Sequence, residues 1–316
     1  MVKKFVYGTP FETEAVVKEI PSSEGNPDYG TFSTENGFSF TTKLADDDMV
    51  FGLGEANRGI NKRGYQYISN NSDNAHHHED VYSLYAAHNF IIVSGEQTFG
   101  LYFDYPSTLT FDVGYTRSAE LHIFCERADL DLYVITGEKP YDITKQFRKM
   151  IGRSYIAPKF AFGFGQSRWG YKTPEDFVAV AEKYRENHIP IDMVYMDIDY
   201  MDNYKDFTVN EEFRDFPQYV ENLKKDHIRL VPIIDAGVKI EEGYDVYEEG
   251  VEKNYFCKRQ DGSDFVAAVW PGYTHFPDVL NPDARKWFGE KYKRLTDAGI
   301  EGFWNDMNEP AIFFTP

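Results

Sequence analysis

Residues 191–197, IDMVYMD, form a nearly continuous apolar run that ends in an aspartate. Three further runs share this apolar character: FAFGFGQ (160–166), RLVPIID (229–235) and IEGFWND (300–306). Runs of this kind are typical of parallel strands, because helices cover both faces of a parallel sheet. From Pro158 onward the sequence therefore predicts four parallel strands.

Helix signals lie between these runs. Thr173 and Asn281 are good N-cap residues, and each is followed by a proline and an acid in the first turn. Gly299 stands where a left-handed residue would end the last helix. The first three strand ends are spaced like the roughly 30-residue units of a (β/α)8 barrel, and the longer third interval predicts an insertion at about 236–280. We therefore expect residues 151–316 to form the first four β/α units of an α/β TIM barrel.

The chain before this region has a different pattern. Short segments of alternating apolar and polar residues, separated by turn residues, are typical of antiparallel strands in a β-sandwich. They lie at residues 98–105, 107–114, 120–126 and 130–137. Residues 61–90 are predicted to be a long loop region, and a helix is expected at about 139–151. Residues 1–150 are thus predicted to form an N-terminal antiparallel β-sandwich domain.

The composition argues against several classes of protein. The 316 residues include 33 Lys and Arg against 52 Asp and Glu, and the formal charge of -19 disfavours nucleic acid and membranes as partners. No apolar run is long enough for a signal peptide or a membrane span, so a cytoplasmic protein is expected if Met1 is the natural start. Cys125 and Cys257 are too few and too far apart for a disulfide scaffold or a zinc module.

Three of the four predicted barrel strands end in an aspartate: Asp197, Asp235 and Asp306. Active sites of (β/α)8 barrels lie at the carboxyl ends of the strands, so these acids are expected at one functional edge. Trp169 follows the first strand and Trp304 precedes the last aspartate by two positions, which adds aromatic surface to this edge. One acid at a strand end often only shapes a turn, but three acids with two tryptophans favour a site.

The motif FWNDMNEP (303–310) contains two acids that could do chemistry. Asp306 is expected on the same side of the strand as Trp304, where a carboxylate beside an indole suits attack on a sugar carbon. Glu309 is the rival, because Asn-Glu-Pro after a barrel strand is also how many retaining β-glycosidases present their acid/base. The motif alone leaves both acids open.

Five segments, in this order, resemble glycoside hydrolase family 31, the α-glucosidases and their relatives. They are SRWGY (167–171), MDIDYMDNYKDFTVN (196–210), VPIIDAGV (231–238), VWPGYTHFPD (269–278) and FWNDMNEP. FGLGE (51–55) is similar to that family's N-terminal domain. The resemblance implies a retaining exo-α-glucosidase that removes terminal glucose from α-linked oligosaccharides and needs no metal or organic cofactor.

The resemblance also implies roles for individual residues. Asp306 would be the catalytic nucleophile, in preference to Glu309. The residues expected to line the glucose pocket are Trp169, Asp197, Ile198, Asp235, Trp270, Trp304 and Met307. Asp73 resembles an N-terminal loop residue that reaches over the barrel to the next sugar unit.

Two motifs could suggest a metal. Asp197 and Asp199 form a DxD, but no phosphate-binding loop accompanies it. His76, His77 and His78 are consecutive, and consecutive histidines on a loop cannot all face one ion. We therefore expect no metal site.

One catalytic part is missing from the predicted units. A retaining glycosidase needs a second carboxyl about 5 Å from the nucleophile, and in the resembled family it comes from later barrel strands. We expect the remainder of the barrel to come from a longer chain or from a complementary chain. An α-xylosidase, a lyase, a transglycosylase or a non-catalytic carbohydrate-binding half are the alternatives.

Overall fold

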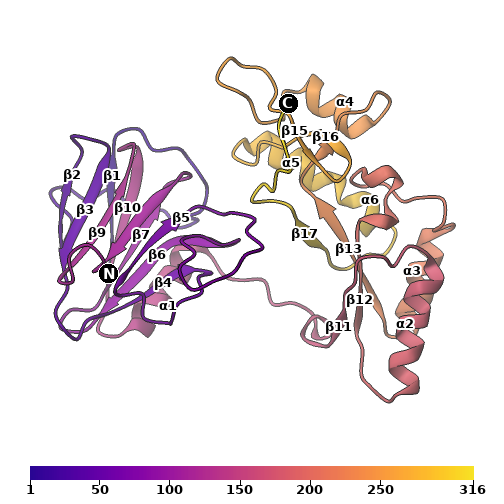
Figure 1. Ribbon diagram of the computed structural model, residues 1–316, viewed down its shortest axis with the longest axis horizontal. Coiled ribbons are helices and arrows are strands. Elements are labelled where there is room, and N and C mark those ends of the chain that lie inside the picture. Colours follow the sequence, from indigo (N-terminus) through magenta and orange to yellow (C-terminus); the bar gives the residue numbers. More distant parts are fainter. The chain divides into compact units, whose positions relative to one another are not determined.

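The computed structural model describes residues 1–316 and divides them into two compact units, Met1–Tyr155 and Ile156–Pro316 (Figure 1). The first unit is built from antiparallel strands and one helix, and the second from a parallel sheet with helices. Every helix in the chain is too short or too polar to cross a membrane. The two units are described separately.

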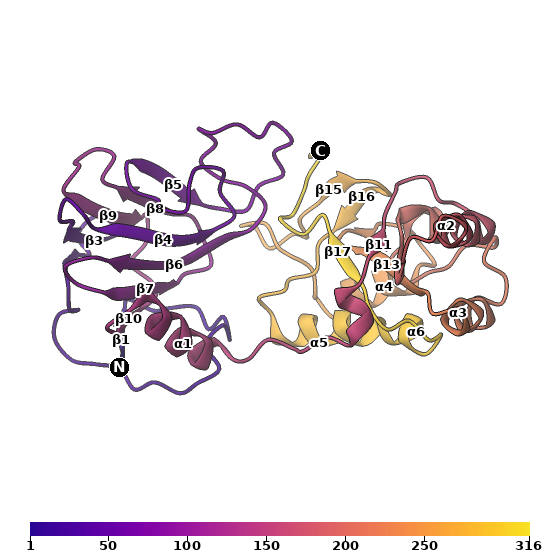
Figure 2. The ribbon, with the colours of Figure 1, turned by 90° about the horizontal axis from the view of Figure 1, so that it is seen from below.

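The first unit contains two five-stranded antiparallel sheets (Figure 2). One sheet has the order β1 (Val2–Tyr7), β10 (Leu130–Thr136), β7 (Phe99–Asp104), β6 (Ala87–Ser94) and β4 (Met49–Gly54). The other has the order β2 (Thr31–Ser33), β3 (Phe38–Lys43), β9 (Glu120–Cys125), β8 (Leu109–Val113) and β5 (Tyr65–Ser69). The predicted sandwich and its four named strands are confirmed.

The core of this sandwich is aromatic. Phe40, Phe103 and Phe111 are fully buried, and Phe103 makes edge-to-face contacts with both of the others at ring-centroid distances of 6.5 and 6.0 Å. Helix α1 (Pro140–Ile151) packs on the first sheet, where the rings of Phe90 and Phe147 are stacked 3.8 Å apart. Alternation of inward apolar and outward polar residues therefore accounts for both sheets.

The predicted loop region at 61–90 is wrong at both ends. Residues 65–69 form β5, whose five residues all pair with β8, and β6 begins at Ala87. The strand forms because Tyr67 points into the sandwich core, where it is buried. Only residues 70–86 between these strands have no helix or strand.

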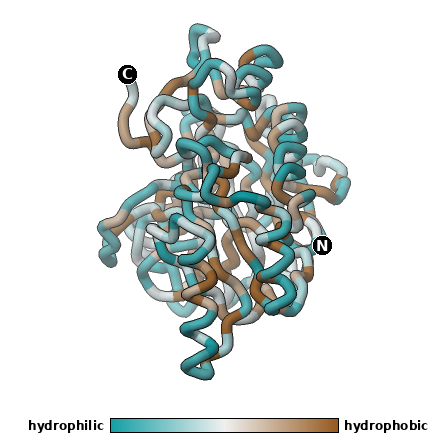
Figure 3. The backbone as a smooth tube through the Cα atoms, turned by 90° about the vertical axis from the view of Figure 1, so that its right-hand side faces the viewer, coloured by the Kyte–Doolittle hydropathy of each residue, from teal (hydrophilic) through white to brown (hydrophobic).

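The second unit is built on a four-stranded parallel sheet. Its order is β11 (Gly165–Gln166), β12 (Met193–Met196), β13 (Arg229–Asp235) and β17 (Trp304–Asp306). The helices that alternate with these strands are α2 (Pro174–Glu186), α3 (Phe216–Lys225), α5 (Pro282–Lys291) and α6 (Lys293–Thr296). Figure 3 shows hydrophilic and hydrophobic residues interspersed along the backbone of the chain. This arrangement of strands and helices confirms the predicted half of a TIM barrel.

Three of the parallel strands are shorter than predicted, and β12 keeps only Met193–Met196 of the expected strand at 191–197. Residues 159–162 form the 3-10 helix η1 (Lys159–Phe162) instead of the start of the first strand. Phe162 is largely exposed there, so no covering layer holds this segment in a sheet. The last strand begins only at Trp304, because the chain from Ile300 to Phe303 still connects helix α6 to the sheet.

The helix boundaries follow the predicted signals. Asn281 caps α5 by accepting hydrogen bonds from the backbone N–H groups of Asp283 and Ala284, at 3.0 and 3.4 Å. At the start of α2, Asp176 accepts a hydrogen bond of 3.0 Å from the backbone N–H of Thr173. Gly299 has a φ of +99°, which a residue with a side chain rarely adopts, and it turns the chain away from α6.

The segment between β13 and α5 forms a small subdomain of its own. It contains α4 (Asp245–Glu252) and a three-stranded antiparallel sheet of β14 (Val238–Lys239), β16 (Gly272–His275) and β15 (Ala267–Val269). The end of the chain returns to this sheet: Phe313 N donates to Ala268 O at 2.9 Å, and Ala268 N donates to Phe314 O at 2.8 Å. The segment that follows β17 is therefore joined to the insertion.

Candidate active site

The carboxyl edge of the parallel sheet brings three aspartates together. Asp235 ends β13 and Asp306 ends β17, and the two residues are direct partners in the strand register. Asp197 follows the last residue of β12. Neighbouring strands lie about 4.8 Å apart, so Asp235 and Asp306 stand side by side. Asp197 lies at the same edge but is offset from Asp235 along the strands, because the residue before it, Met196, pairs with Pro232.

Asp235 is the most buried of the three, with 3% of its surface exposed. Burial, together with the negative charges of Asp306 and Asp197, raises the pKa of its carboxyl to about 7. Its Oδ1 atom has no hydrogen-bond partner in residues 1–316. An unpaired oxygen on a buried carboxyl is costly in an empty site, and a sugar hydroxyl can satisfy it.

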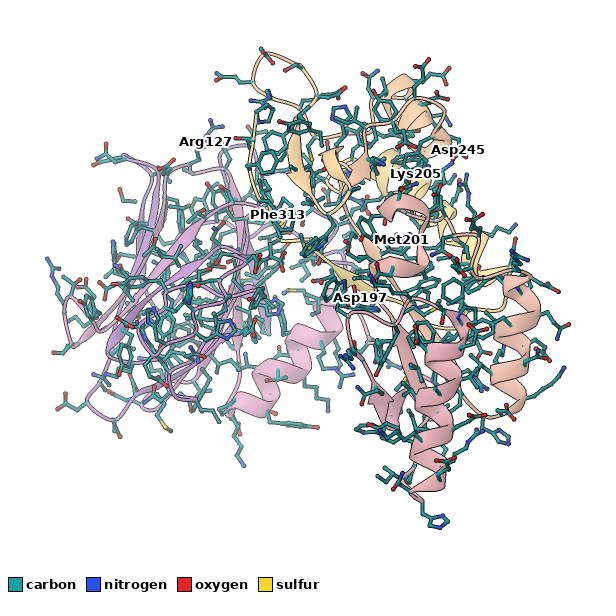
Figure 4. The ribbon with its side chains drawn as sticks, turned by 45° about the vertical axis from the view of Figure 1, so that its right-hand side comes forward. Arg127, Asp197, Met201, Lys205, Asp245 and Phe313 are labelled. Atoms are coloured by element: carbon teal, nitrogen blue, oxygen red, sulfur yellow. The ribbon has the colours of Figure 1, made fainter.

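Asp197 is half-buried at the start of the loop that leaves β12 (Figure 4). Its Oδ1 accepts a hydrogen bond of 2.8 Å from the backbone N–H of Ile198. Burial raises the pKa of this carboxyl, and the charges of Asp199 and Asp306 add to the rise, while the hydrogen bond from Ile198 opposes it. Ile198 itself is buried beneath this edge.

Asp306 is held by its neighbours on β17. The indole Nε1 of Trp304 donates a hydrogen bond of 3.1 Å to Met196 O on β12. The hydroxyl of Tyr292 donates to Asn305 Oδ1 at 2.6 Å. Met307 has a φ of +60°, which ends the strand, and its side chain is buried with the insertion's small core. Of the two acids in the motif FWNDMNEP, Asp306 lies in strand β17 and Glu309 lies in the turn that follows it.

Two tryptophans of the predicted set are exposed. Trp169, in the loop after β11, is 64% exposed, with Lys172 Nζ 5.9 Å from its ring. Trp270 follows β15 and is 52% exposed, and Phe313 packs edge-on against it at 4.9 Å. Exposed ring faces of this kind can stack on the C–H faces of a sugar.

One residue of the predicted set belongs to the first unit. Asp73 is exposed there, in the segment between β5 and β6, and its contact with a sugar stays a prediction. The neighbouring histidines are also exposed, and His78 pairs with Asp80. No group of three or more histidine, cysteine or acidic side chains in residues 1–316 is arranged to hold a metal ion.

The sequence interpretation missed one buried acid beside this edge. Asp206, within the loop after β12, is 1% exposed and accepts a hydrogen bond of 3.1 Å from the backbone N–H of Asp235. It lies within the quoted segment 196–210, where it is one of several acids. Only its burial singles it out.

The second unit is thus half of a barrel with acids and tryptophans at its carboxyl edge, and the first unit is a β-sandwich. Residues 154–316 match the model of the glycosyl hydrolases family 31 TIM-barrel domain, and residues 11–112 match the family's N-terminal galactose mutarotase-like domain. The chain belongs to glycoside hydrolase family 31.

The most similar relatives include two α-glucosidases. The chain is 39% identical to alpha-glucosidase 2 of Bacillus thermoamyloliquefaciens over 275 residues, covering 86% of this chain and 35% of that protein. It is 27% identical to an alpha-glucosidase of Saccharolobus solfataricus over 318 residues, covering 99% of this chain and 46% of that protein. The chain thus spans between a third and a half of the length of these relatives.

Solved structures share the fold. The glucosidase II alpha subunit solved with alpha3-Glc2 is 25% identical to the chain. Its TM-score is 0.78, and the match covers 93% of this chain and 37% of that one. A Flavobacterium johnsoniae family 31 dextranase complexed with glucose has a TM-score of 0.82 at 24% identity, covering 89% of this chain and 35% of that one. The second likeness shows the fold alone.

Proposed function

We propose that this chain is the N-terminal portion of a retaining exo-α-glucosidase that removes terminal non-reducing glucose from α-linked oligosaccharides. The observation that carries the proposal is the position of Asp306 at the carboxyl end of β17, in register with the buried Asp235. The names of the two curated relatives support glucose as the sugar.

In the proposed reaction Asp306 is the nucleophile. Its carboxylate attacks C1 of the terminal glucose while the bond from C1 to the leaving oxygen breaks and that oxygen takes a proton from an acid. The product is a β-glucosyl ester on Asp306. Water, deprotonated by the same group acting as base, then attacks C1, releases α-glucose and restores the carboxylate.

The other edge residues would bind the sugar. Asp235 has an unpaired Oδ1 atom and Asp197 has one oxygen held by the Ile198 N–H group, so both can accept hydrogen bonds from glucose hydroxyls. Trp169 and Trp270 offer exposed ring faces for stacking. We assign Ile198, Trp304 and Met307 to the wall of the pocket, and Asp73 to a contact with the next sugar unit. No step of this scheme uses a metal or an organic cofactor.

The acid/base is proposed to lie outside residues 1–316. A sheet of four strands leaves two strand edges of the barrel open, and a closed barrel needs eight strands. Further strands, from a longer chain or from a complementary chain, would close the barrel and supply the second carboxyl. The shares of the relatives that this chain covers support the longer chain.

The test is an Asp306→Ala variant of the natural full-length protein. Turnover of an α-glucoside is expected to fall by about 10⁴-fold or more, while glucose binding persists, because the variant lacks only the group that forms the ester. With an activated α-glucoside, added azide can enter the space left by the carboxylate and yield β-glucosyl azide.

The matched control for this test is Asp202→Asn, which removes an acid from the loop after β12 that is paired with Lys205 on the surface. This variant should keep near-normal turnover. Near-normal turnover by Asp306→Ala would reject Asp306 as nucleophile. Comparing α-glucosides with α-xylosides separates the glucosidase from a xylosidase, and sugar binding without any hydrolysis would indicate a non-catalytic protein.

A further inference from the structure

Asp206 joins three segments around the candidate site. Its Oδ1 atom accepts the backbone N–H of Asp235 at the end of β13, at 3.1 Å. Its own carbonyl oxygen accepts a hydrogen bond of 2.8 Å from the hydroxyl of Tyr244, the residue before α4. Asp206 thus ties the loop after β12 to the end of β13 and to the insertion.

The surroundings of Asp206 contain no cation that could balance a negative charge. The side chain is 1% exposed, and its Oδ2 atom has no hydrogen-bond partner. The adjacent Lys205 is engaged elsewhere, in ion pairs of 2.9 Å with Asp202 and with Glu241. Figure 4 shows Lys205 and Met201 on this loop, which continues from Asp197. A buried carboxylate without a cation is strongly disfavoured relative to the neutral acid.

The titratable groups that face Asp206 come from four elements. They are Asp235 of β13, Tyr200 of η2 (Ile198–Tyr200), Tyr244 before α4, and Tyr292 at the end of α5. Tyr200 donates its hydroxyl proton to Ile233 O at 2.8 Å, so it does not stabilise a charged Asp206. Burial raises the pKa of Asp206 well above its usual range, and the charge of Asp235 adds to the rise.

We propose that Asp206 is a positioning residue which, as an uncharged acid, fixes the backbone from which Asp235 presents its carboxyl to the sugar. This inference rests on the proposed function, because it assumes that Asp235 binds glucose. The neutral acid accepts the backbone N–H of Asp235 and adds no further negative charge to the group formed by Asp197, Asp235 and Asp306. Asp235 is therefore held in place without being driven further toward its protonated form.

The experiment is a double-mutant cycle on glucose binding, measured by calorimetry in the natural full-length protein. Asp206→Ala leaves the backbone N–H of Asp235 buried without an acceptor and should weaken glucose binding by about tenfold. In an Asp235→Asn background the same substitution should weaken binding less than about twofold, because its effect acts through Asp235. Additive losses would overturn the proposal, since a general structural defect acts in both backgrounds.

Asp206→Asn is the conservative rescue. The amide oxygen can still accept the N–H group and the side chain stays neutral, so glucose affinity should remain within about threefold of the natural protein. Asp202→Asn, a substitution in the same loop, is the matched control and should leave binding unchanged. An Asp206→Asn variant that folds, by its thermal melt, but binds as weakly as Asp206→Ala would reject the role of a neutral acid.

The pH dependence of binding keeps the proposal testable if Asp206→Ala fails to fold. An uncharged Asp206 predicts that Asp206→Asn leaves the pH profile of glucose binding unmoved. A profile displaced by about one unit to lower pH would mean that Asp206 carries a charge in the natural protein, and would overturn the proposal. If the natural protein itself binds no glucose, the proposed function fails first and the inference fails with it.

Discussion

The sandwich and the half barrel differ in how completely their sheets are covered. In the sandwich, two five-stranded sheets bury each other's inner faces, and residues on the central strands such as Phe40, Phe111 and Leu121 are fully buried. In the half barrel the interior strands β12 and β13 are mostly buried, while both residues of β11 are half-buried and Asn305 of β17 is exposed. The two sheets of the sandwich cover each other, whereas the parallel sheet of the second unit has unpaired edges at β11 and β17.

The largest effect should come from separating the units. Residues 1–155 produced alone are expected to give a monomer with one cooperative thermal melt, because the core of the sandwich lies within that range. Residues 156–316 alone should associate or melt without cooperativity, because the edges of β11 and β17 are unpaired. Circular dichroism melts with light scattering measure both outcomes. A monomeric, cooperative 156–316 would break the comparison.

A pair of phenylalanine substitutions sharpens the contrast at the level of single residues. Phe111→Ala in the sandwich core should lower the free energy of unfolding by about 3–5 kcal/mol, because it removes a fully buried ring that packs on Phe103. Phe162→Ala in η1, where the ring is 76% exposed, should change it by less than about 0.5 kcal/mol. Denaturant unfolding of the 316-residue chain measures both. A large loss at Phe162 would show that the segment before β11 is already covered.

A third effect, spread over several pH units, concerns protons at the carboxyl edge. The pKa of Asp235 is raised to about 7, so the folded chain keeps a proton that the unfolded chain loses above its ordinary pKa of 3.8. Stability from this group is therefore present below about pH 4 and is lost as the pH rises toward 7. One such proton contributes at most about 1.4 kcal/mol for each pH unit. Denaturant unfolding at a series of pH values measures the slope.

The control for the pH series is Asp235→Asn, which cannot titrate. Between pH 4 and 7 the free energy of unfolding of this variant should fall less steeply with pH than that of the natural chain. The difference in slope should be at most about 1.4 kcal/mol per pH unit. Burial, the largest cause, raises the pKa of Asp206 in both chains, while the added rise from the charge of Asp235 is present only in the natural chain. Equal slopes would mean that Asp235 titrates normally.

How far the fold could be predicted depended on burial. The strand at 229–235 has the same bounds in the sequence interpretation and in the structure, where six of its seven residues are buried. Of the strand expected at 160–166, only Gly165–Gln166 is a strand in the structure. The apolar composition of this segment did not reveal that it lies at the edge of the sheet with little cover. Residues 65–69 were missed because Tyr and Gln in a polar region hid an alternating strand.

The candidate site could also be predicted only in part from the sequence. Asp197, Asp235 and Asp306 could be predicted because a parallel sheet places all carboxyl strand ends at one edge. The part played by Asp206 could not, since the hydrogen bond from the backbone of Asp235 joins a loop residue to a strand and leaves no periodic pattern in the sequence. The roles of Asp73, Trp169 and Trp270 stay predictions, because these side chains are exposed and no contact in the structure ties them to the acids.

The backbone pairing between Ala268 and residues 313–314 also bears on the order in which the protein is made. A ribosome releases the amino-terminal part first, so the sandwich can be complete while the barrel strands are still being synthesised. The sheet of the insertion gains its pairing with residues 313–314 later, because these residues follow Asp306 in the chain. The loop that carries Trp270 and the strand that carries Asp306 are therefore completed in the same interval of translation, after the rest of the first four units.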